Sequence, residues 1–314
     1  MQTNRTQTLS KPLTVCLLAA IACALWGSAA PVIKIGYKLF AIDGSDTWTI
    51  ILFAGMRFFL AGVLVILFAS LTGRRFNLPQ KGSWGNVMKL SFFQTIAQYM
   101  FFYIGVAHAS GVHSAILTGA SNLWAILLAC FLFRQERMNA PKLLGCLLGF
   151  GGIILMNLTG EGGGVTLLGE GFVLFSGICS GVASSQAKKY SKTESPITLT
   201  GWQFLLGGLV MMVCAFAMGG RLTVASAAGA GILLYLGFLS AVAYSLWTLL
   251  LRHNPVSGVS IYGFMTPMFG VVFSAVLLGE AGQAFSLNTL AALLMVCAGI
   301  VAVNRFGSGT KVHK

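Results

Sequence analysis

Ten long apolar stretches run through the chain, separated by short segments that carry most of its charged residues. Each holds about 20 mostly apolar residues, enough for an α-helix to cross the roughly 30 Å hydrocarbon layer of a bilayer. The apolar residues are continuous and do not alternate with polar ones, which excludes a β-barrel. The pattern predicts an all-α integral membrane protein with ten transmembrane helices, at residues 13–36, 48–70, 86–107, 111–133, 142–158, 167–187, 196–218, 229–251, 256–279 and 286–304.

The composition agrees with this pattern. Hydrophobic residues make up 56% of the chain and charged residues 9%, and the mean hydropathy is +0.84. A soluble domain carries about 25% charged residues, and a disordered chain combines low hydrophobicity with high charge, so both classes are excluded. The longest connection, residues 71–85, is too short for a soluble domain. Function is therefore expected inside the helix bundle, with the lipid bilayer as surrounding partner.

The net charge of +13 comes from short basic clusters between the apolar stretches. Nucleic-acid binding would need a contiguous basic face on a soluble module, so no nucleic-acid partner is expected. With the N-terminus in the cytoplasm, fifteen of the twenty Lys and Arg fall in cytoplasmic segments and three fall on the opposite side. This asymmetry predicts a multi-pass protein with both termini cytoplasmic, in the cell membrane and most simply a bacterial inner membrane.

The two halves of the chain resemble each other at a spacing of 146 residues. The segment Gly55-Met-Arg-Phe-Phe-Leu-Ala-Gly62 matches Gly201-Trp-Gln-Phe-Leu-Leu-Gly-Gly208, and residues 96–101 match residues 242–247. The fourth and ninth stretches both open with Ser-Gly-Val, at Ser110 and Ser257. These matches predict four parts: an N-terminal cytoplasmic tail (1–12), a first five-helix repeat (13–158), a second five-helix repeat (167–304) and a C-terminal cytoplasmic tail (305–314).

Because each repeat has an odd number of spans, the second repeat starts on the opposite side of the membrane from the first. The two five-helix repeats are therefore expected to be inverted about an axis in the membrane plane. Inverted repeats are typical of transporters, whose substrate site lies near the bilayer midplane where the repeats meet.

Several motifs resemble those of the drug/metabolite transporter superfamily, EamA type, to which the bacterial aromatic amino acid exporters are related. They are Leu25-Trp-Gly-Ser28, Arg57-Phe-Phe-Leu60, Ala243-Tyr-Ser-Leu-Trp247, and Pro267 followed by Leu277-Leu-Gly-Glu280. The resemblance covers nearly the whole chain. It implies ten helices, inverted repeats, a central cavity and export of amino acids, metabolites or toxic compounds. The first half departs from the pattern, because Leu123 stands where the second half has Pro267.

Polar and aromatic residues within the predicted spans are candidates for a central substrate site. An unpaired amide is costly in hydrocarbon, so Gln98 and Asn122 should face protein or water. The aromatic candidates lie too deep for an interfacial belt. Hydrogen bonding between helices is the alternative role for the amides. The predicted substrate-binding residues are Trp26, Gln98, Tyr99, Asn122, Tyr244, Trp247 and Tyr262.

Two cations within or near the spans are candidates for contact with substrate or for a structural role. Arg57 lies well inside its span, where a charge is expensive and is functional by default. It could bond helix-end carbonyls or contact a substrate carboxylate. Lys34 lies near the outer end of the first span. All seven acidic residues lie in loops or at span ends, so carboxylate-based proton coupling is not expected.

These observations predict a secondary transporter, an exporter or facilitator of a small organic metabolite or amino acid, working by alternating access through a central cavity. A proton-coupled exporter of drugs or toxic compounds is the alternative. An intramembrane enzyme would need a buried nucleophile and base or a metal cluster, and the spans show neither. A channel would show rings of charge or carbonyl filters. No catalytic residue, metal or cofactor is expected, and the chain is expected to act as a monomer on a small-molecule substrate.

Overall fold

A computed structural model of the chain describes residues 9–74, 76–108, 117–157, 166–223, 226–278 and 287–306. Within these ranges the chain forms helices joined by turns, without strands, which confirms the all-α class. Seven helical stretches are long and apolar enough to span a bilayer: Pro12–Leu39, Thr47–Gly73, Trp84–His108, Leu167–Tyr190, Pro196–Ala217, Ala227–His253 and Val256–Leu277. Shorter apolar helices occupy Leu117–Phe131, Ala140–Leu155 and Leu290–Phe306. The number of ten spans stays a prediction.

The first half contains α2 (Pro12–Leu39), α3 (Thr47–Gly73), α4 (Trp84–Ser91), η1 (Phe92–Ala97), α5 (Gln98–His108), α7 (Ser121–Phe131) and α8 (Ala140–Asn157). The second half contains η2 (Leu167–Gly171), α9 (Phe172–Tyr190), α10 (Pro196–Ala217), α11 (Ala227–His253), α12 (Val256–Ser260), η3 (Ile261–Met265), α13 (Thr266–Leu278), α15 (Leu287–Val301) and η4 (Ala302–Phe306). Elements η1, η2 and η4 are π-helical, and η3 is a 3-10 helix.

Helix starts follow local chemistry. Pro12 and Pro196 lie in the first turns of α2 and α10, where a missing N–H costs nothing. Asp46 caps α3, accepting a hydrogen bond from the backbone N–H of Thr49 at 3.0 Å. Hydrogen bonding from Thr49 holds the pKa of the exposed Asp46 carboxyl below its ordinary value.

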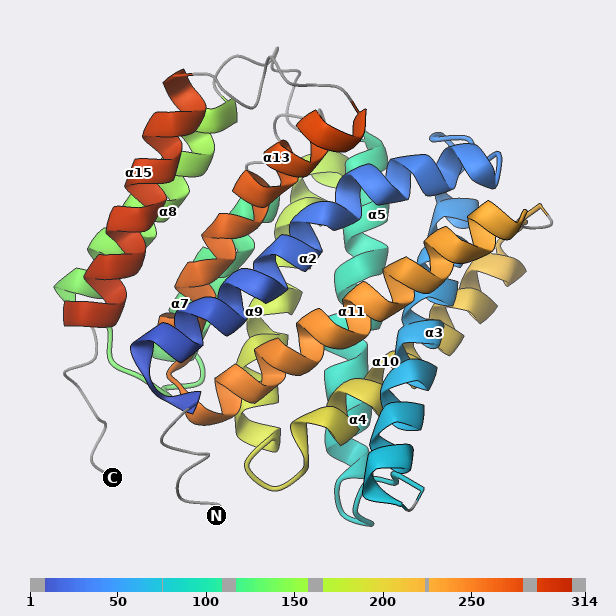
Figure 1. The fold of residues 1–314 in the computed structure, drawn as a ribbon, viewed down its shortest axis with the longest axis horizontal. Coiled ribbons are helices and arrows are strands. Elements are labelled where there is room, and N and C mark those ends of the chain that lie inside the picture. The colour runs from blue at the N-terminus through green and yellow to red at the C-terminus, as the bar shows by residue number, and fades with distance from the viewer. Residues whose placement is uncertain are drawn as a thin grey trace.

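The two halves meet where α3 packs along α10 (Figure 1). A Cβ added at Gly55 would lie 3.1 Å from the Gly208 carbonyl oxygen, and one added at Gly62 would lie 2.8 Å from the Gly201 carbonyl oxygen. The two glycine pairs run in opposite chain directions, so the helices cross antiparallel. At the 146-residue spacing, Gly55 is equivalent to Gly201 and Gly62 to Gly208. Exchanging each residue for its equivalent therefore turns one pair into the other. The repeated segment of α3 therefore packs against its counterpart in α10, as the two sides of a two-fold symmetric interface do.

The other helix pairs follow the same relation. Helix α2 packs on α11 and α13, and α9 packs on α5 and α7, while α8 and α15 lie side by side at one edge of the bundle (Figure 1). Helix α2 begins and α15 ends toward the same end of the bundle, drawn at the bottom of Figure 1, where α9 also leads into α10. This end, with the segments 132–139, 191–195 and 254–255, is called the lower end below.

One helix is broken near its middle. Pro267 has no N–H, and its ring crowds the carbonyl of Gly263, four residues earlier. The chain is a 3-10 helix over Ile261–Met265 and returns to α-helix as α13. A 3-10 stretch inside a helix often marks a hinge. Leu123, at the equivalent position of the first half, lies in the α-helix α7, as expected from the absence of a proline there.

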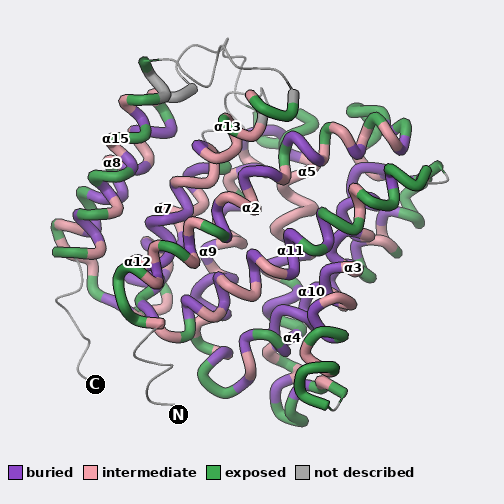
Figure 2. Tube along the Cα trace, viewed as in Figure 1, coloured by how far each residue is buried: buried purple, intermediate pink, exposed green. Residues whose placement is uncertain are grey.

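The outer surface of the bundle is apolar. Exposed residues, coloured green in Figure 2, occur along most of the helices, and the exposed apolar ones include Phe68 at 63%, Val213 at 60% and Leu294 at 64%. A soluble monomer rarely exposes apolar patches of this extent. This surface is what a protein surrounded by lipid tails requires.

Candidate functional site

Four of the seven predicted substrate-binding residues lie together in an aromatic cluster at the junction of the two halves. The Trp26 ring on α2 meets the rings of Tyr244 and Trp247 on α11 edge-on, with centroids 5.0 and 4.9 Å apart. Tyr99, at the start of α5, places its hydroxyl 2.6 Å from the Tyr244 hydroxyl. Edge-on packing at these distances is the arrangement that aromatic quadrupoles favour.

Two phenylalanines that the sequence analysis did not select complete this aromatic cluster. Phe58 on α3 and Phe204 on α10 are fully buried, and their rings stack with centroids 5.2 Å apart and planes 14° apart. Phe58 contacts Tyr99 at 4.3 Å, and Phe204 contacts Tyr244 at 4.8 Å. Phe58 and Phe204 are 146 residues apart, so repeat-equivalent residues stack where α3 and α10 meet. Equivalence within the repeated segment was the signal that could have identified them.

The aromatic cluster includes polar groups that can form further hydrogen bonds. The Trp26 indole nitrogen is buried and has no hydrogen-bond partner among the described residues. The Tyr99 and Tyr244 hydroxyls share one hydrogen bond, which leaves further lone pairs on each oxygen. A bound solute could accept from Trp26 or exchange hydrogen bonds with the tyrosine pair.

Two other predicted residues lie together at the break in the helix that starts at α12. Tyr262 belongs to η3 and is buried, and the thiol of Cys23 on α2 donates a hydrogen bond to its carbonyl oxygen at 3.2 Å. The side-chain amide of Asn122 on α7 lies against Gly263, so an added Cβ at Gly263 would require this amide to move. Tyr262 and Trp247 belong to one hydrophobic core, against which Trp26 packs.

The remaining candidates are less integrated. Gln98 is half-buried at the junction of η1 and α5, and its side chain makes no hydrogen bond within the part of the chain that the structure describes. Lys34 is exposed on α2, outside the aromatic cluster. The structure thus brings together the aromatic candidates more closely than the charged and amide ones.

Arg57 borders the aromatic cluster and is 5% exposed. Its guanidinium carbon lies 4.3 Å from the centroid of the Phe58 ring and 5.7 Å from that of Tyr99, within the range of cation–π attraction. Its Nε atom is buried without a hydrogen-bond partner among the described residues.

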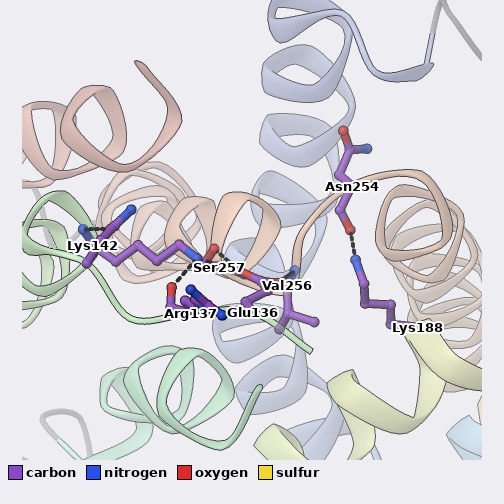
Figure 3. Close-up of polar contacts among 8 residues, drawn as sticks. Glu136, Arg137, Lys142, Lys188, Asn254, Val256 and Ser257 are labelled. Atoms are coloured by element: carbon purple, nitrogen blue, oxygen red, sulfur yellow. Dashed lines mark hydrogen bonds and ion pairs between the residues drawn. The ribbon is translucent and has the colours of Figure 1, made fainter. Parts of the chain in front are cut away.

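A charged contact joins the two halves at the lower end (Figure 3). Glu136, between α7 and α8, accepts hydrogen bonds from the backbone N–H of Val256 and from the N–H and hydroxyl of Ser257 at the start of α12. Lys142 pairs with Glu136 at 3.0 Å and also donates to the Arg137 carbonyl at 2.9 Å. Nearby, Lys188 donates to the Asn254 carbonyl. Both members of the Glu136–Lys142 pair are buried, so breaking it is costly.

A cleft of about 580 Å³ opens at the lower end of the bundle, between the C-terminus of α3 and the N-terminus of α10. Its lining includes Asn77, Glu194, Thr198 and Arg252. Glu194 accepts hydrogen bonds there from the backbone N–H groups of Gln80 and Ser195. This cleft is separate from the aromatic cluster, whose rings touch one another.

The fold and this site define a multi-pass helical membrane protein built from two repeats. The profile of the EamA-like transporter family matches residues 13–158 and again residues 167–305. The chain belongs to the EamA-like transporter family, which confirms the resemblance seen in the sequence motifs.

Individual relatives agree with this family. An "Uncharacterized transporter YvbV" of Bacillus subtilis is 25% identical over 92% of this chain and 90% of its own length. A "Probable amino-acid metabolite efflux pump" of Salmonella typhimurium is 25% identical over 92% of this chain and 94% of its own length. A WAT1-related chloroplastic protein of Arabidopsis thaliana is 26% identical over 77% of this chain, and the match spans 60% of that longer relative.

The fold is also similar to a solved one. A protein crystal structure with 16% sequence identity superposes with a TM-score of 0.76, over 92% of this chain and 97% of the other.

Proposed function

We propose that this chain is a secondary transporter that moves a small organic metabolite or amino acid across the membrane by alternating access, as an exporter or facilitator. The observation that carries the proposal is the position of the aromatic cluster, which is built from helices of both halves where α3 and α10 cross. Substrate sites of repeat-built transporters lie at such junctions. Membership of a transporter family and relatives named as transporters support the same function.

The proposed architecture is ten spans in two inverted five-helix repeats, in a monomer of a bacterial inner membrane. The antiparallel self-contact of α3 and α10 supports the inversion. The basic residues Lys142, Lys188 and Arg252 gather toward the lower end, which supports a cytoplasmic assignment for it and for both termini.

The chemistry of the aromatic cluster favours a solute with an apolar body and a few polar groups. Aromatic faces offer apolar and cation–π contacts, while the tyrosine hydroxyls and the Trp26 indole offer hydrogen bonds. The relative named as an amino-acid metabolite efflux pump supports amino acids and their derivatives as the first class to test.

The contact between Glu136 and Ser257 is proposed to hold the lower end closed. It ties the segment between α7 and α8 to the start of α12, in the other half. Opening the aromatic cluster toward the lower end would require this contact to break, and the 3-10 stretch at Tyr262 would provide the hinge. The described acidic residues all lie at helix ends or in connections, so transport down the solute's own gradient is the simplest coupling.

Counterflow in vesicles tests the proposal. Purified protein would be reconstituted into vesicles loaded with an unlabelled amino acid, and entry of the labelled form would be followed. Transient, saturable accumulation is expected for a transporter. Ionic conductance with no saturable counterflow for any member of an amino acid and metabolite panel would contradict it.

A further inference from the structure

Arg57 carries a positive charge that no acidic side chain among the described residues neutralises. It follows Thr47, the first residue of α3, by ten positions, or about 15 Å along the helix axis. The side chain is 5% exposed. A buried charge is retained in a membrane-spanning helix only when something compensates the loss of hydration.

Within the ranges that the structure describes, no acidic side chain serves as counter-ion to this guanidinium. The titratable groups that act electrostatically on it are the phenols of Tyr103, Tyr99, Tyr244 and Tyr37, and none of these is a carboxylate. Arg57 makes no ion pair with any acidic residue in the described ranges, and its Nε donor is buried without a partner. Contact with the faces of Phe58 and Tyr99 offsets part of the cost but leaves the Nε donor without a hydrogen bond among the described residues.

The second repeat has the neutral Gln203 at the same position; its side-chain oxygen has a partner, although its Nε2 atom is buried without one among the described residues. Gln203, the residue equivalent to Arg57, accepts a hydrogen bond from the Thr95 hydroxyl at 2.6 Å through its side chain. Its backbone carbonyl accepts one from the Ser91 hydroxyl at 2.9 Å. The residues equivalent to Ser91 and Thr95 in the second repeat are Gly237 and Ala241, which carry no hydroxyl. The protein thus supplies hydroxyl partners to Gln203. At the equivalent positions of the other repeat, which correspond to the surroundings of Arg57, it has smaller, apolar residues.

We propose that Arg57 binds the carboxylate of the transported solute, while the aromatic cluster binds the solute's apolar body. This inference rests on the proposed transport function and names its substrate class: a monocarboxylate with an apolar or aromatic body. A guanidinium matches a carboxylate with two parallel hydrogen bonds. One carboxylate makes the buried pair neutral, whereas a dianionic phosphate would leave a net negative charge in the same site.

The test compares acids with amides that have the same body. Binding of phenylacetate and phenylacetamide, and of hexanoate and hexanamide, would be measured on the detergent-purified full chain by tryptophan fluorescence and thermal shift. The wild type would be compared with Arg57→Gln, which installs the residue of the second repeat, and with Arg57→Lys, which keeps the charge. Lys38→Gln, which removes an exposed cation from α2, is the control.

The wild type and Lys38→Gln are expected to bind each acid at least about tenfold more tightly than its amide, because a charge-assisted bond is lost in the amide. Arg57→Gln should lose the preference for the acid and bind acid and amide alike. Arg57→Lys should keep a reduced preference for the acid, which tests the proposal even if Arg57→Gln does not fold. A purely structural Arg57 would instead lower the affinity for acids and amides equally.

Equal binding of acid and amide by the wild type, or an acid preference that survives in Arg57→Gln, would overturn the inference. Counterflow assays keep this result separate from the proposed function. Saturable counterflow of neutral solutes without any acid preference would remove the Arg57 site and leave the transporter. Acid-selective binding without counterflow of any tested solute would support the Arg57 site and contradict the proposed transport function.

Discussion

At the scale of single residues, Trp26 connects the parts of the candidate site. It packs against Tyr244 and Trp247 of α11, and it borders both the hydrophobic core that holds Tyr262 and the one that holds Phe58. Substrate bound among these rings would gain apolar contact with helices of both halves. Movement of one half against the other would then change the surroundings of the substrate.

Removing a ring from the aromatic cluster should therefore impair transport more than folding. Trp247→Ala is expected to lower saturable counterflow by about tenfold or more, because a truncated aromatic anchor typically costs 2 kcal/mol or more of binding. Trp84→Ala removes a half-buried tryptophan that makes a similar edge contact with Trp202, far from the aromatic cluster, and serves as control. Normal transport by purified, folded Trp247→Ala would show that this ring is not part of the site.

At the scale of helices, the crossing of α3 and α10 depends on glycine. The backbones approach so closely at Gly55 with Gly208 and at Gly62 with Gly201 that a Cβ would meet carbonyl oxygens. Small residues allow this approach, and packing is the main force that holds helices together in a membrane.

A branched side chain at this crossing should destabilise the protein. Gly62→Val is expected to cost about 1–3 kcal/mol by overpacking, seen as a lower midpoint of thermal unfolding in detergent. The control is Gly231→Val on α11, where an added Cβ meets no atom within 4 Å and the change in helix propensity is the same. Equal loss of stability in the two variants would mean that the crossing tolerates larger residues.

At the scale of the whole molecule, the Glu136 contact links the two halves at the lower end. Glu136→Gln removes the charge that pairs with Lys142, so the start of α12 should open more often. Amide hydrogen exchange at Val256 and Ser257 is expected to become at least about tenfold faster, because hydrogen bonds to a charged acceptor are the strong ones.

Glu170→Gln is the control for this measurement. Glu170 is also buried, and it accepts a hydrogen bond from the N–H of Thr166, four residues away in the sequence. Its substitution should leave exchange at Val256 and Ser257 unchanged. Unaltered exchange in Glu136→Gln would show that the Glu136 contact does not limit opening of the lower end.

The proposed orientation can be tested by labelling from one side of the membrane. Gly44 and Gly82 are both exposed, and an added Cβ has no atom within 4 Å at either position. In a cysteine-free background, a membrane-impermeant thiol reagent should label Gly44→Cys on intact cells, and Gly82→Cys only after the cells are opened. The reverse pattern would contradict cytoplasmic termini.

The sequence predicted those features that depend on local pattern. Continuous apolar runs located the helices, and the repeated Gly55–Gly62 segment predicted two related halves. Phe58 and Phe204 were missed because an apolar residue in an apolar helix gives no local sign of which face it occupies. The link from Glu136 to Ser257 was also missed, since it joins residues 121 positions apart. Both depend on how helices pack, which one helix alone does not determine.

The central claim is that one site, at the junction of the halves, opens alternately to the two sides of the membrane. Accessibility of a single cysteine at Gln98→Cys tests this directly, because Gln98 adjoins Tyr99 and its side chain makes no hydrogen bond to other described residues. In vesicles, an impermeant thiol reagent should label this cysteine from either side, and a solute that supports counterflow should protect it from both. Labelling from one side only, unaffected by that solute, would contradict the account.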